Sequence, residues 1–382
     1  MELSNKTRLL GLSRAELEEV AEELGQPSYR GRQIFDAIYR QRVGRLEAIS
    51  TLPVGMRGEL AKRGIAVGEL SVGKKFESCD GTIRYLIGLE DGESVETVWM
   101  PEGDGGEIGD GSEAGEEPAG AGGGRSRATI CISSQVGCAV NCQFCLTAAL
   151  GVKRNLTAGE IVGQVCAVLG DRGVVPPQER VNLVFMGMGE PFLNYEQFIS
   201  AVRLLVEGVG IPESRMTVST AGIVPKIHEF GLEAIRPKLA ISLNGSNDSL
   251  RARLMPLNRK WDLEMLIGAA REFPLRTREK LTFEYVLLRG VNDSPAQARE
   301  LTELIRGIRA KVNLIGFNPG PGIEFETPES AQVLEFQRLL TKSGIPTFIR
   351  RPRGRDIYAA CGQLKRTMEL ATIGNAPVSG QN

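Results

Sequence analysis

Histidine is almost absent from this chain, since His228 is the single histidine among 382 residues. Hydrolytic sites of the Ser-His-Asp and Cys-His kinds use a histidine as the general base. One histidine nearly excludes catalysis and metal centres that are built on several histidines. His228 lies in the sequence PKIHEF, and we interpret it as an ordinary helix residue.

Long apolar runs are missing as well. No segment approaches the roughly 18 consecutive apolar residues of a membrane span, and the N-terminal sequence MELSNKTRLL lacks the apolar segment of a signal peptide. We therefore expect a cytoplasmic protein without membrane contact, whose thiols are reduced. A hydrophobic content of 42% is enough for a large core, which excludes disorder for most of the chain.

Net charge is also small, at −1 from 46 basic and 47 acidic residues, which ordinarily argues against a nucleic-acid partner. The charge is unevenly distributed, however. Residues 102–124 contain seven acidic residues, no basic ones and ten glycines, and we expect them to form a disordered acidic insertion. The remaining 46 basic and 40 acidic residues give a net charge of +6, which is compatible with binding a polyanion.

Two accessory regions precede this insertion. Residues 1–65 are predicted to form a helical domain, with a capping box at Ser13 and Glu16 and a second helix over 30–41. Eight basic and three acidic residues between Tyr29 and Arg63 favour RNA contact, although a solvated helix face is the commoner cause of such a run. Residues 66–101 contain Asp-Gly pairs typical of hairpins, which predict an antiparallel β meander.

Residues 125–350 alternate short apolar strands with capped helices. This α/β pattern predicts a partial (βα)6 barrel of the TIM type, in which ligands bind at the carboxyl ends of the strands. A C-terminal segment, 351–382, follows it. The six predicted strands are 128–134, 181–187, 215–220, 238–243, 280–288 and 311–317.

Four of the seven cysteines lie between Cys131 and Cys145, too close together for a disulfide framework. Cys138, Cys142 and Cys145 follow the first predicted barrel strand directly. Three thiolates can bind three irons of a [4Fe-4S] cluster and leave the fourth iron open to another ligand. A structural zinc ion normally takes four protein ligands, and no second pair of cysteines or histidines follows. We therefore favour a [4Fe-4S] cluster over zinc.

The Cys-x3-Cys-x2-Cys spacing resembles that of the radical S-adenosylmethionine (SAM) superfamily. The sequence GMGEP, which contains Gly189 and Glu190, resembles the Gly-Gly-Glu-Pro motif of the same superfamily, which binds the amino group of SAM. The segments CISSQVGCAVNCQFC, VFMGMGEP, STAGIVP, RARLMPLNRKW and FNPGPG together resemble the RlmN/Cfr family of RNA methyltransferases. Asn244 departs from the pattern, because many relatives have histidine there.

The resemblance implies a role for individual residues. Cys361 would carry a methyl group taken from a first SAM, and Cys131 would release the product by forming a disulfide with Cys361. Glu96 would accept a proton. For Cys131 the alternative is a small buried strand residue. The SAM contacts implied are Gly189, Glu190, Ser219, Ser242, Leu243, Asn244 and Asn318.

The resemblance also implies an activity and its partners. The expected reaction is methylation of C2 of one adenine in 23S rRNA and of the adenine adjoining the tRNA anticodon, with two SAM consumed for each methylation. The four arginines between Arg350 and Arg355 are candidates for phosphate contact. We also expect a flavodoxin- or ferredoxin-type electron donor and a monomeric enzyme. The alternatives are methylation of adenine C8, as in Cfr, or an inactive RNA-binding protein that keeps the cluster.

Overall fold

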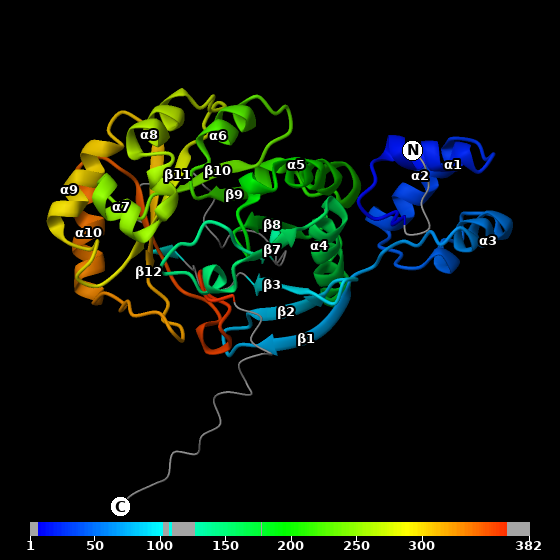
Figure 1. Ribbon diagram of the computed structural model, residues 1–382, viewed down its shortest axis with the longest axis horizontal. Helices are drawn as coiled ribbons and strands as arrows, with labels where there is room; N and C mark the ends of the chain where they lie inside the picture. Colours follow the sequence, from blue (N-terminus) through cyan, green and yellow to red (C-terminus); the bar gives the residue numbers. More distant parts are fainter. Residues whose placement is uncertain (1–6, 102–106, 109–126, 177, 365–382) are drawn as a thin grey trace, which may run out of the picture.

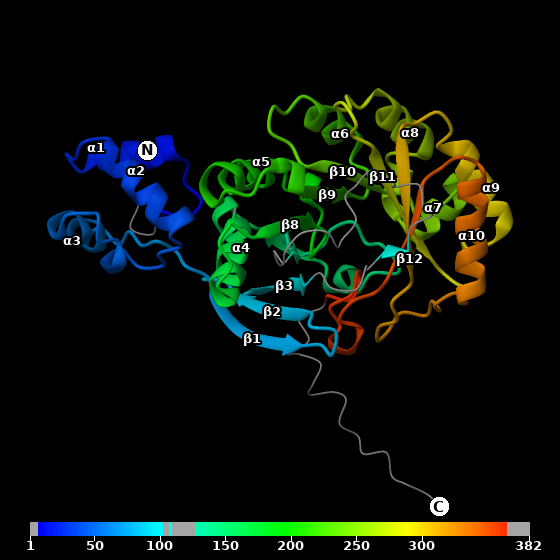
Figure 2. The same cartoon turned by 180° about the vertical axis from the view of Figure 1, so that it is seen from behind.

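The fold of the chain is taken from a computed structural model that describes residues 7–101, 107–108, 127–176 and 178–364. Figure 1 shows one large curved sheet with helices on its outer side, and a small helical unit beside it. Seen from behind in Figure 2, the antiparallel strands β1 to β3 form one end of the sheet.

The helical unit at the N-terminus contains three helices, α1 (Arg14–Glu23), α2 (Tyr29–Phe35) and α3 (Val54–Lys62). The predicted capping box opens α1, because Ser13 Oγ accepts the backbone N–H of Glu16 while the Glu16 carboxylate accepts that of Ser13. The predicted second helix is confirmed, but its last turn, Asp36–Arg40, widens into a π-helix. This unit packs on the barrel through Tyr39, which donates its hydroxyl to Leu12 O at 2.8 Å and lies against Gly208.

The predicted antiparallel meander is confirmed as β1 (Ser71–Glu77), β2 (Ile83–Gly88) and β3 (Ser94–Pro101). Its two turns contain the Asp-Gly pairs at 80–81 and 91–92, as the sequence predicts. Strand β3 then pairs antiparallel with the first barrel strand. The meander therefore extends the barrel sheet and is not a separate domain.

The sheet has the order β1-β2-β3-β5-β8-β9-β10-β11-β12-β13-β4. Strands β5 to β13 in this order are mutually parallel, which confirms the six predicted barrel strands. A seventh parallel strand, β13, was not predicted, because its four residues are too few to show a periodicity. The parallel strands are β5 (Arg127–Cys131), β8 (Arg180–Phe185), β9 (Met216–Thr220), β10 (Lys238–Ser242), β11 (Leu281–Leu287), β12 (Ala310–Gly316) and β13 (Thr347–Arg350).

Helices cover the outer face of the parallel strands (Figure 1). Capping boxes at Thr157 and Ser294 open α4 and α9, which agrees with the capped helices expected for this region. His228 lies on α6 with 48% of its side chain exposed, which fits an ordinary helix residue. The helices are α4 (Ala158–Arg172), α5 (Tyr195–Leu204), α6 (Val224–Gly231), α7 (Asp248–Leu254), α8 (Leu263–Glu272), α9 (Pro295–Leu304) and α10 (Ser330–Lys342).

Most of the acidic segment 102–124 lies outside the described residues. Two of its residues, Glu107–Ile108, form the short strand β4. This strand pairs antiparallel with β13, in a register that places Glu107 opposite Arg350. Glu107 and Ile108 therefore lie at the edge of the sheet, beside the strand that leads to Cys361.

In the part of the chain that the structure describes, none of the helices is both long enough and apolar enough to cross a bilayer.

Candidate active site

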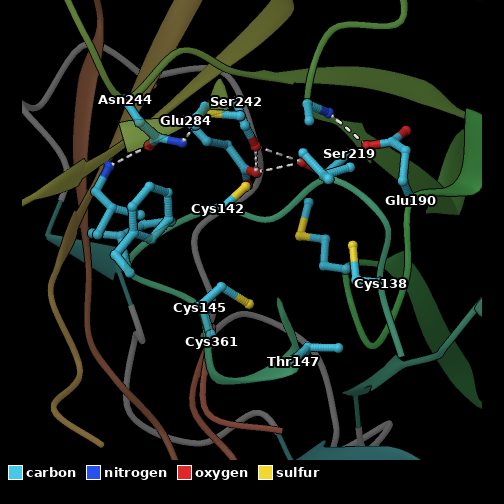
Figure 3. Close-up of a pocket in the computed structure, with 18 of the residues that line it drawn as sticks. Cys138, Cys142, Cys145, Thr147, Glu190, Ser219, Ser242, Asn244, Glu284 and Cys361 are labelled. Carbon is cyan, nitrogen blue, oxygen red and sulfur yellow. Dashed lines mark hydrogen bonds between the residues drawn. The ribbon is translucent and has the colours of Figure 1, made fainter. Parts of the chain in front are cut away.

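A cavity opens at the carboxyl ends of the parallel strands, where the sequence predicts ligand binding (Figure 3). Its wall combines three parts of the chain that are distant in sequence. These are the cysteine loop after β5, the polar residues that end β8 to β12, and the C-terminal loop with Cys361.

The three cysteines of the loop all line this cavity. The loop is held by backbone hydrogen bonds from Cys138 N to Gly151 O at 2.9 Å and from Gln143 N to Leu254 O at 2.9 Å. Burial raises the pKa of the Cys138 thiol to about 12 and raises that of Cys142 well above its ordinary value. A metal must therefore displace these protons when it binds.

The donor set fits a polynuclear cluster better than a single metal ion. Among the described residues, no three His, Cys, Asp or Glu side chains converge closely enough to hold one ion. A zinc ion requires such convergence. In a [4Fe-4S] cluster each thiolate binds a different iron, so the thiols must surround a space. Cys138, Cys142 and Cys145 have this arrangement around the cavity.

The GMGEP turn after β8 is fitted closely to the base of the cysteine loop. A Cβ atom at Gly189, whose φ is +99°, would lie 2.6 Å from Gln135, so only glycine fits there. The Glu190 carboxylate is buried and accepts the backbone N–H groups of Ala221 at 2.7 Å and Phe192 at 3.0 Å. Burial raises the pKa of Glu190 to about 7, and a bound cation would stabilise its ionised form.

The other predicted SAM contacts lie at neighbouring strand ends. Ser219 and Ser242 line the cavity with their hydroxyl oxygens 3.2 Å apart. Asn244 adopts a left-handed conformation with φ 56°, and its Oδ1 accepts Val286 N at 2.8 Å. Leu243 is fully buried and does not belong to the cavity wall, so its side chain faces the core.

The structure adds a residue that sequence reasoning missed. Glu284 lies on β11 and lines the cavity as a buried carboxylate. Its Oε2 accepts the Ser219 hydroxyl at 2.7 Å and lies 3.5 Å from the Ser242 hydroxyl (Figure 3). Burial raises the pKa of Glu284. The sequence signal that could have indicated Glu284 is a single carboxylate within the apolar strand LTFEYVLL. A charge that is buried in such a strand requires polar partners.

The C-terminal loop is fastened to the cavity at its base. Asn318 donates Nδ2 to the backbone oxygen of Cys361 at 3.2 Å and accepts Arg355 Nε at 2.9 Å. Leu146, directly after the third cysteine of the loop, donates its N–H to Gly362 O at 2.8 Å. These bonds place Cys361 beside the cysteine loop.

The turn between β1 and β2 holds the same C-terminal loop from the other side. Ser78 donates its hydroxyl to Asp356 at 2.6 Å, and Gly354 donates its backbone N–H to Asp80 at 2.9 Å. Burial raises the pKa of Asp80, but hydrogen bonds from Gly354 of the loop and from Thr82 and Ser78 of its own turn lower it overall. The meander therefore helps to position the loop that contains Cys361.

Cys131 and Cys361 lie 230 positions apart in sequence but close enough in the fold for their charges to interact. Burial and then the nearby Cys361 raise the pKa of Cys131. Burial and Glu284 raise the pKa of Cys361 to about 11, while Arg350 opposes this shift. Both residues are free thiols in this structure. The thiols of the two cysteines therefore lie at one site.

Glu96 lies outside the wall of this cavity. Its side chain is 1% exposed and forms an ion pair with Arg84 of the adjacent strand β2, which is 2% exposed. The backbone oxygen of Glu96 accepts the Ser133 hydroxyl at 2.6 Å, directly after β5. The Glu96 carboxylate therefore belongs to a buried ion pair between β2 and β3.

The arginine run before Cys361 faces the protein more than its sequence suggests. Arg353 donates to Pro101 O at 2.7 Å, and Arg355 donates to Asn318. Arg350 lies near Cys361, where its charge lowers the pKa of that thiol. The run therefore helps to build the loop around Cys361, whereas the sequence pattern had indicated phosphate contact alone.

The chain is similar over most of its length to curated RNA methyltransferases. The probable dual-specificity RNA methyltransferase RlmN of Koribacter versatilis is 63% identical over 92% of this chain and 99% of that protein. The dual-specificity RNA methyltransferase RlmN of Syntrophobacter fumaroxidans is 45% identical over 91% of this chain and 95% of that protein. Residues 132–302 match the model of the radical SAM superfamily.

A solved structure has the same fold. The crystal structure of a radical SAM methyltransferase from Sphaerobacter thermophilus is 42% identical and superimposes with a TM-score of 0.83, covering 94% of this chain and 99% of that one. The similarity therefore includes the N-terminal helices and the β meander as well as the barrel.

Proposed function

This chain belongs to the RlmN family of dual-specificity RNA methyltransferases within the radical SAM superfamily, and on that basis we propose that it methylates adenine C2 in 23S rRNA and tRNA. The proposal rests on Cys361, which lines the same cavity as the three cysteines of the loop, and on Cys131 at the end of the strand that leads into that loop. A C2–H bond is neither acidic nor nucleophilic, so ordinary displacement at that carbon is slow. A protein thiol that carries the methyl group supplies another route.

Two cofactors fit the cavity. Cys138, Cys142 and Cys145 would hold a [4Fe-4S] cluster, and SAM would lie against Gly189, Glu190 and the strand ends. Bound together, they supply the methyl group and the means of removing a hydrogen atom from it. The polar contacts proposed for SAM are Ser219, Ser242, Asn244, Glu284 and Asn318.

Cys361 would act first as a nucleophile. Its thiol must lose a proton, and the positive charge of Arg350 favours the thiolate. The thiolate sulfur then displaces the methyl group from the sulfonium of one SAM. The backbone bonds around Gly354 and Gly362 hold the loop of Cys361 in the cavity wall, where its methylated sulfur would lie. After hydrogen removal, the carbon on this sulfur would bond to the adenine.

Cys131 would then release the RNA. Its thiolate would attack the sulfur of Cys361, forming an S–S bond and breaking the bond between that sulfur and the new carbon. The carbon would keep the electron pair of the broken bond and take up a proton, which completes the methyl group. Glu96 is proposed to take the proton that leaves the adenine carbon. Reduction of the disulfide by an external thiol returns both cysteines to the form in which they occur here.

Several partners are proposed on the family's chemistry. The RNA would approach the basic N-terminal unit, where residues 29–63 carry eight basic side chains. A flavodoxin- or ferredoxin-type protein would supply electrons to a monomeric enzyme in the cytoplasm.

A Cfr-type reaction at adenine C8 is the second candidate, because it uses the same two cysteines. A cluster protein without catalysis is disfavoured, because RNA binding alone needs neither Cys131 nor Cys361.

The proposal is tested by anaerobic reconstitution with iron and sulfide, followed by incubation with SAM, a reductant and either 23S rRNA or tRNA. Nucleoside mass spectrometry should find 2-methyladenosine in both RNAs. Finding 8-methyladenosine instead would replace the proposed reaction with the Cfr type. If the protein contained the cluster and cleaved SAM but left the RNA unmodified, methylation at C2 and methylation at C8 would both be contradicted.

Glu284→Gln should weaken SAM binding about tenfold, because a charged acceptor for two hydroxyl donors is worth roughly 1.5–3 kcal/mol per hydrogen bond. The variant keeps the shape of the side chain but replaces the charge that holds Ser219 and Ser242 in place. Equilibrium dialysis with cluster-loaded protein measures the dissociation constant. Glu303→Gln, on the exposed surface of α9, is the control and should bind SAM normally. Unchanged affinity in Glu284→Gln would remove Glu284 from the SAM site.

A further inference from the structure

Arg251 on α7 is a cation in the interior, and no anionic side chain among the described residues contacts it. Its side chain has no exposed surface. The guanidinium donates to the backbone oxygens of Ala221 at 2.6 Å, Leu243 at 3.0 Å and Ser242 at 3.3 Å, and to Asn258 Oδ1 at 2.7 Å. All four acceptors are neutral oxygens. Burying a charge in this way is costly unless an anion compensates it.

The carboxylate of Asp248 is linked to Arg251 only through Asn258. Asp248 is exposed and accepts Asn258 Nδ2 at 2.7 Å, so Asn258 separates it from the guanidinium. Burial lowers the pKa of Arg251 to about 10, which leaves it charged at neutral pH. Solvent screens the exposed carboxylate, so most of the buried charge stays uncompensated within the described chain.

The position of Arg251 is enforced by two glycines. A Cβ atom at Gly245 would lie 2.8 Å from the Cα of Arg251, and one at Gly222 would lie 3.2 Å from its Nη2. The loops after β9 and β10 therefore leave room for this side chain and no more. This close packing indicates that the guanidinium is held in one position.

The cysteine loop supplies the missing negative charge. Gln143 donates its backbone N–H to Leu254 O at the end of α7, which fastens the loop to the helix that carries Arg251. Arg251 and Cys142 lie close enough for their charges to interact. As thiols, the three cysteines are neutral, but as cluster ligands they are thiolates.

We propose that Arg251 is an electrostatic and positioning residue of the cluster site, which stabilises the reduced cluster and holds the ends of β9 and β10 against SAM. This inference rests on the proposed ligation of the cluster by Cys138, Cys142 and Cys145. Adding an electron makes the cluster more negative, and a buried cation beside one ligand favours that state. The same guanidinium joins the carbonyls of Ala221, Ser242 and Leu243, at the strand ends proposed to contact SAM.

The test is the reduction potential of the reconstituted cluster, measured without SAM by an EPR-monitored redox titration. Arg251→Gln should shift the equilibrium toward the oxidised cluster at least about tenfold, which is about 59 mV for one electron. Arg251→Lys retains the charge and should stay within about threefold of the unmodified chain. Arg253→Gln removes an exposed arginine from the same helix and should change the equilibrium by less than about twofold, because solvent screens it.

A second variant avoids removing the side chain. The double change Asp248→Asn with Asn258→Asp keeps the net charge and reverses the hydrogen bond between these residues. It places a carboxylate directly on Arg251, so the potential should fall as in Arg251→Gln. This variant decides the matter if Arg251→Gln fails to fold.

The possible failures are distinguishable. The electrostatic role of Arg251 would be overturned if all variants that contain the cluster had the same reduction potential. It would also be overturned if the reduction potential fell equally in Arg251→Lys and Arg251→Gln. An unmodified chain that binds no four-iron cluster would instead contradict the proposed cofactor. Iron and sulfide analysis, made before each titration, separates the two cases.

Discussion

Cys361→Ala is expected to abolish methylation, lowering the rate by more than about a thousandfold, because the variant has no sulfur to carry the methyl group. The loop that carries this residue is held through backbone oxygens and N–H groups, so the fold should be unaffected. Nucleoside mass spectrometry should find unmodified adenine. Intact-protein mass spectrometry should detect an added methyl group on the enzyme without the substitution and none on Cys361→Ala.

Cys79→Ala is the matched control for this variant. Cys79 is an exposed free thiol, and it lies on the β1–β2 turn that holds the same loop. Its replacement should leave methylation within about twofold, as expected for a surface position. Full activity in Cys361→Ala would overturn the role of Cys361 as methyl carrier. Loss of bound iron in that variant would assign it a structural role instead.

Cys131→Ala is expected to trap a covalent complex between the protein and the RNA. The variant can still form the bond from Cys361 to adenine, but no thiol remains at the end of β5 to break it. The release of methylated RNA should fall by at least about a hundredfold. The complex should be visible as a protein–RNA band on a denaturing gel, and nuclease digestion should leave a modified adenosine on the Cys361 peptide.

Two controls restrict the interpretation of that result. The double variant Cys131→Ala with Cys361→Ala should give no band, because the carrier sulfur is missing. Cys166→Ala removes a partly buried thiol from α4, outside the cavity, and should release product normally. Normal turnover in Cys131→Ala would show that Cys131 is an ordinary strand residue, which is the alternative that its apolar surroundings suggest.

Much of the scaffold could be predicted from local sequence signals. The Asp-Gly pairs fix hairpins because their residues adopt turn conformations that few others tolerate. The capping boxes at Ser13, Thr157 and Ser294 fix helix starts because each uses residues only three positions apart. Strand β13 escaped prediction because its four residues acquire their strand geometry only by pairing with β12.

The site was predicted less completely than the scaffold. The cysteine loop has a spacing that can be recognised in the sequence, and its three thiols line one cavity. Glu284 lies in no quoted motif, and Arg251 lies in the segment RARLMPLNRKW, which assigns it no role. The significance of both residues depends on being buried beside groups from other parts of the chain. The arginine run was interpreted as a phosphate contact, since sequence gives its charge but not its partners, Pro101 and Asn318.

The sequence by itself determined the order of elements, the cysteine spacing and the family, because these depend on residues close together in the chain or on motifs that act as units. The tertiary structure alone decided which distant groups share one site. It brought the thiols of Cys131 and Cys361 together, paired Glu96 with Arg84 and placed a buried cation beside Cys142. These effects depend on burial and distance, which local sequence patterns do not specify, because packing between remote segments sets both.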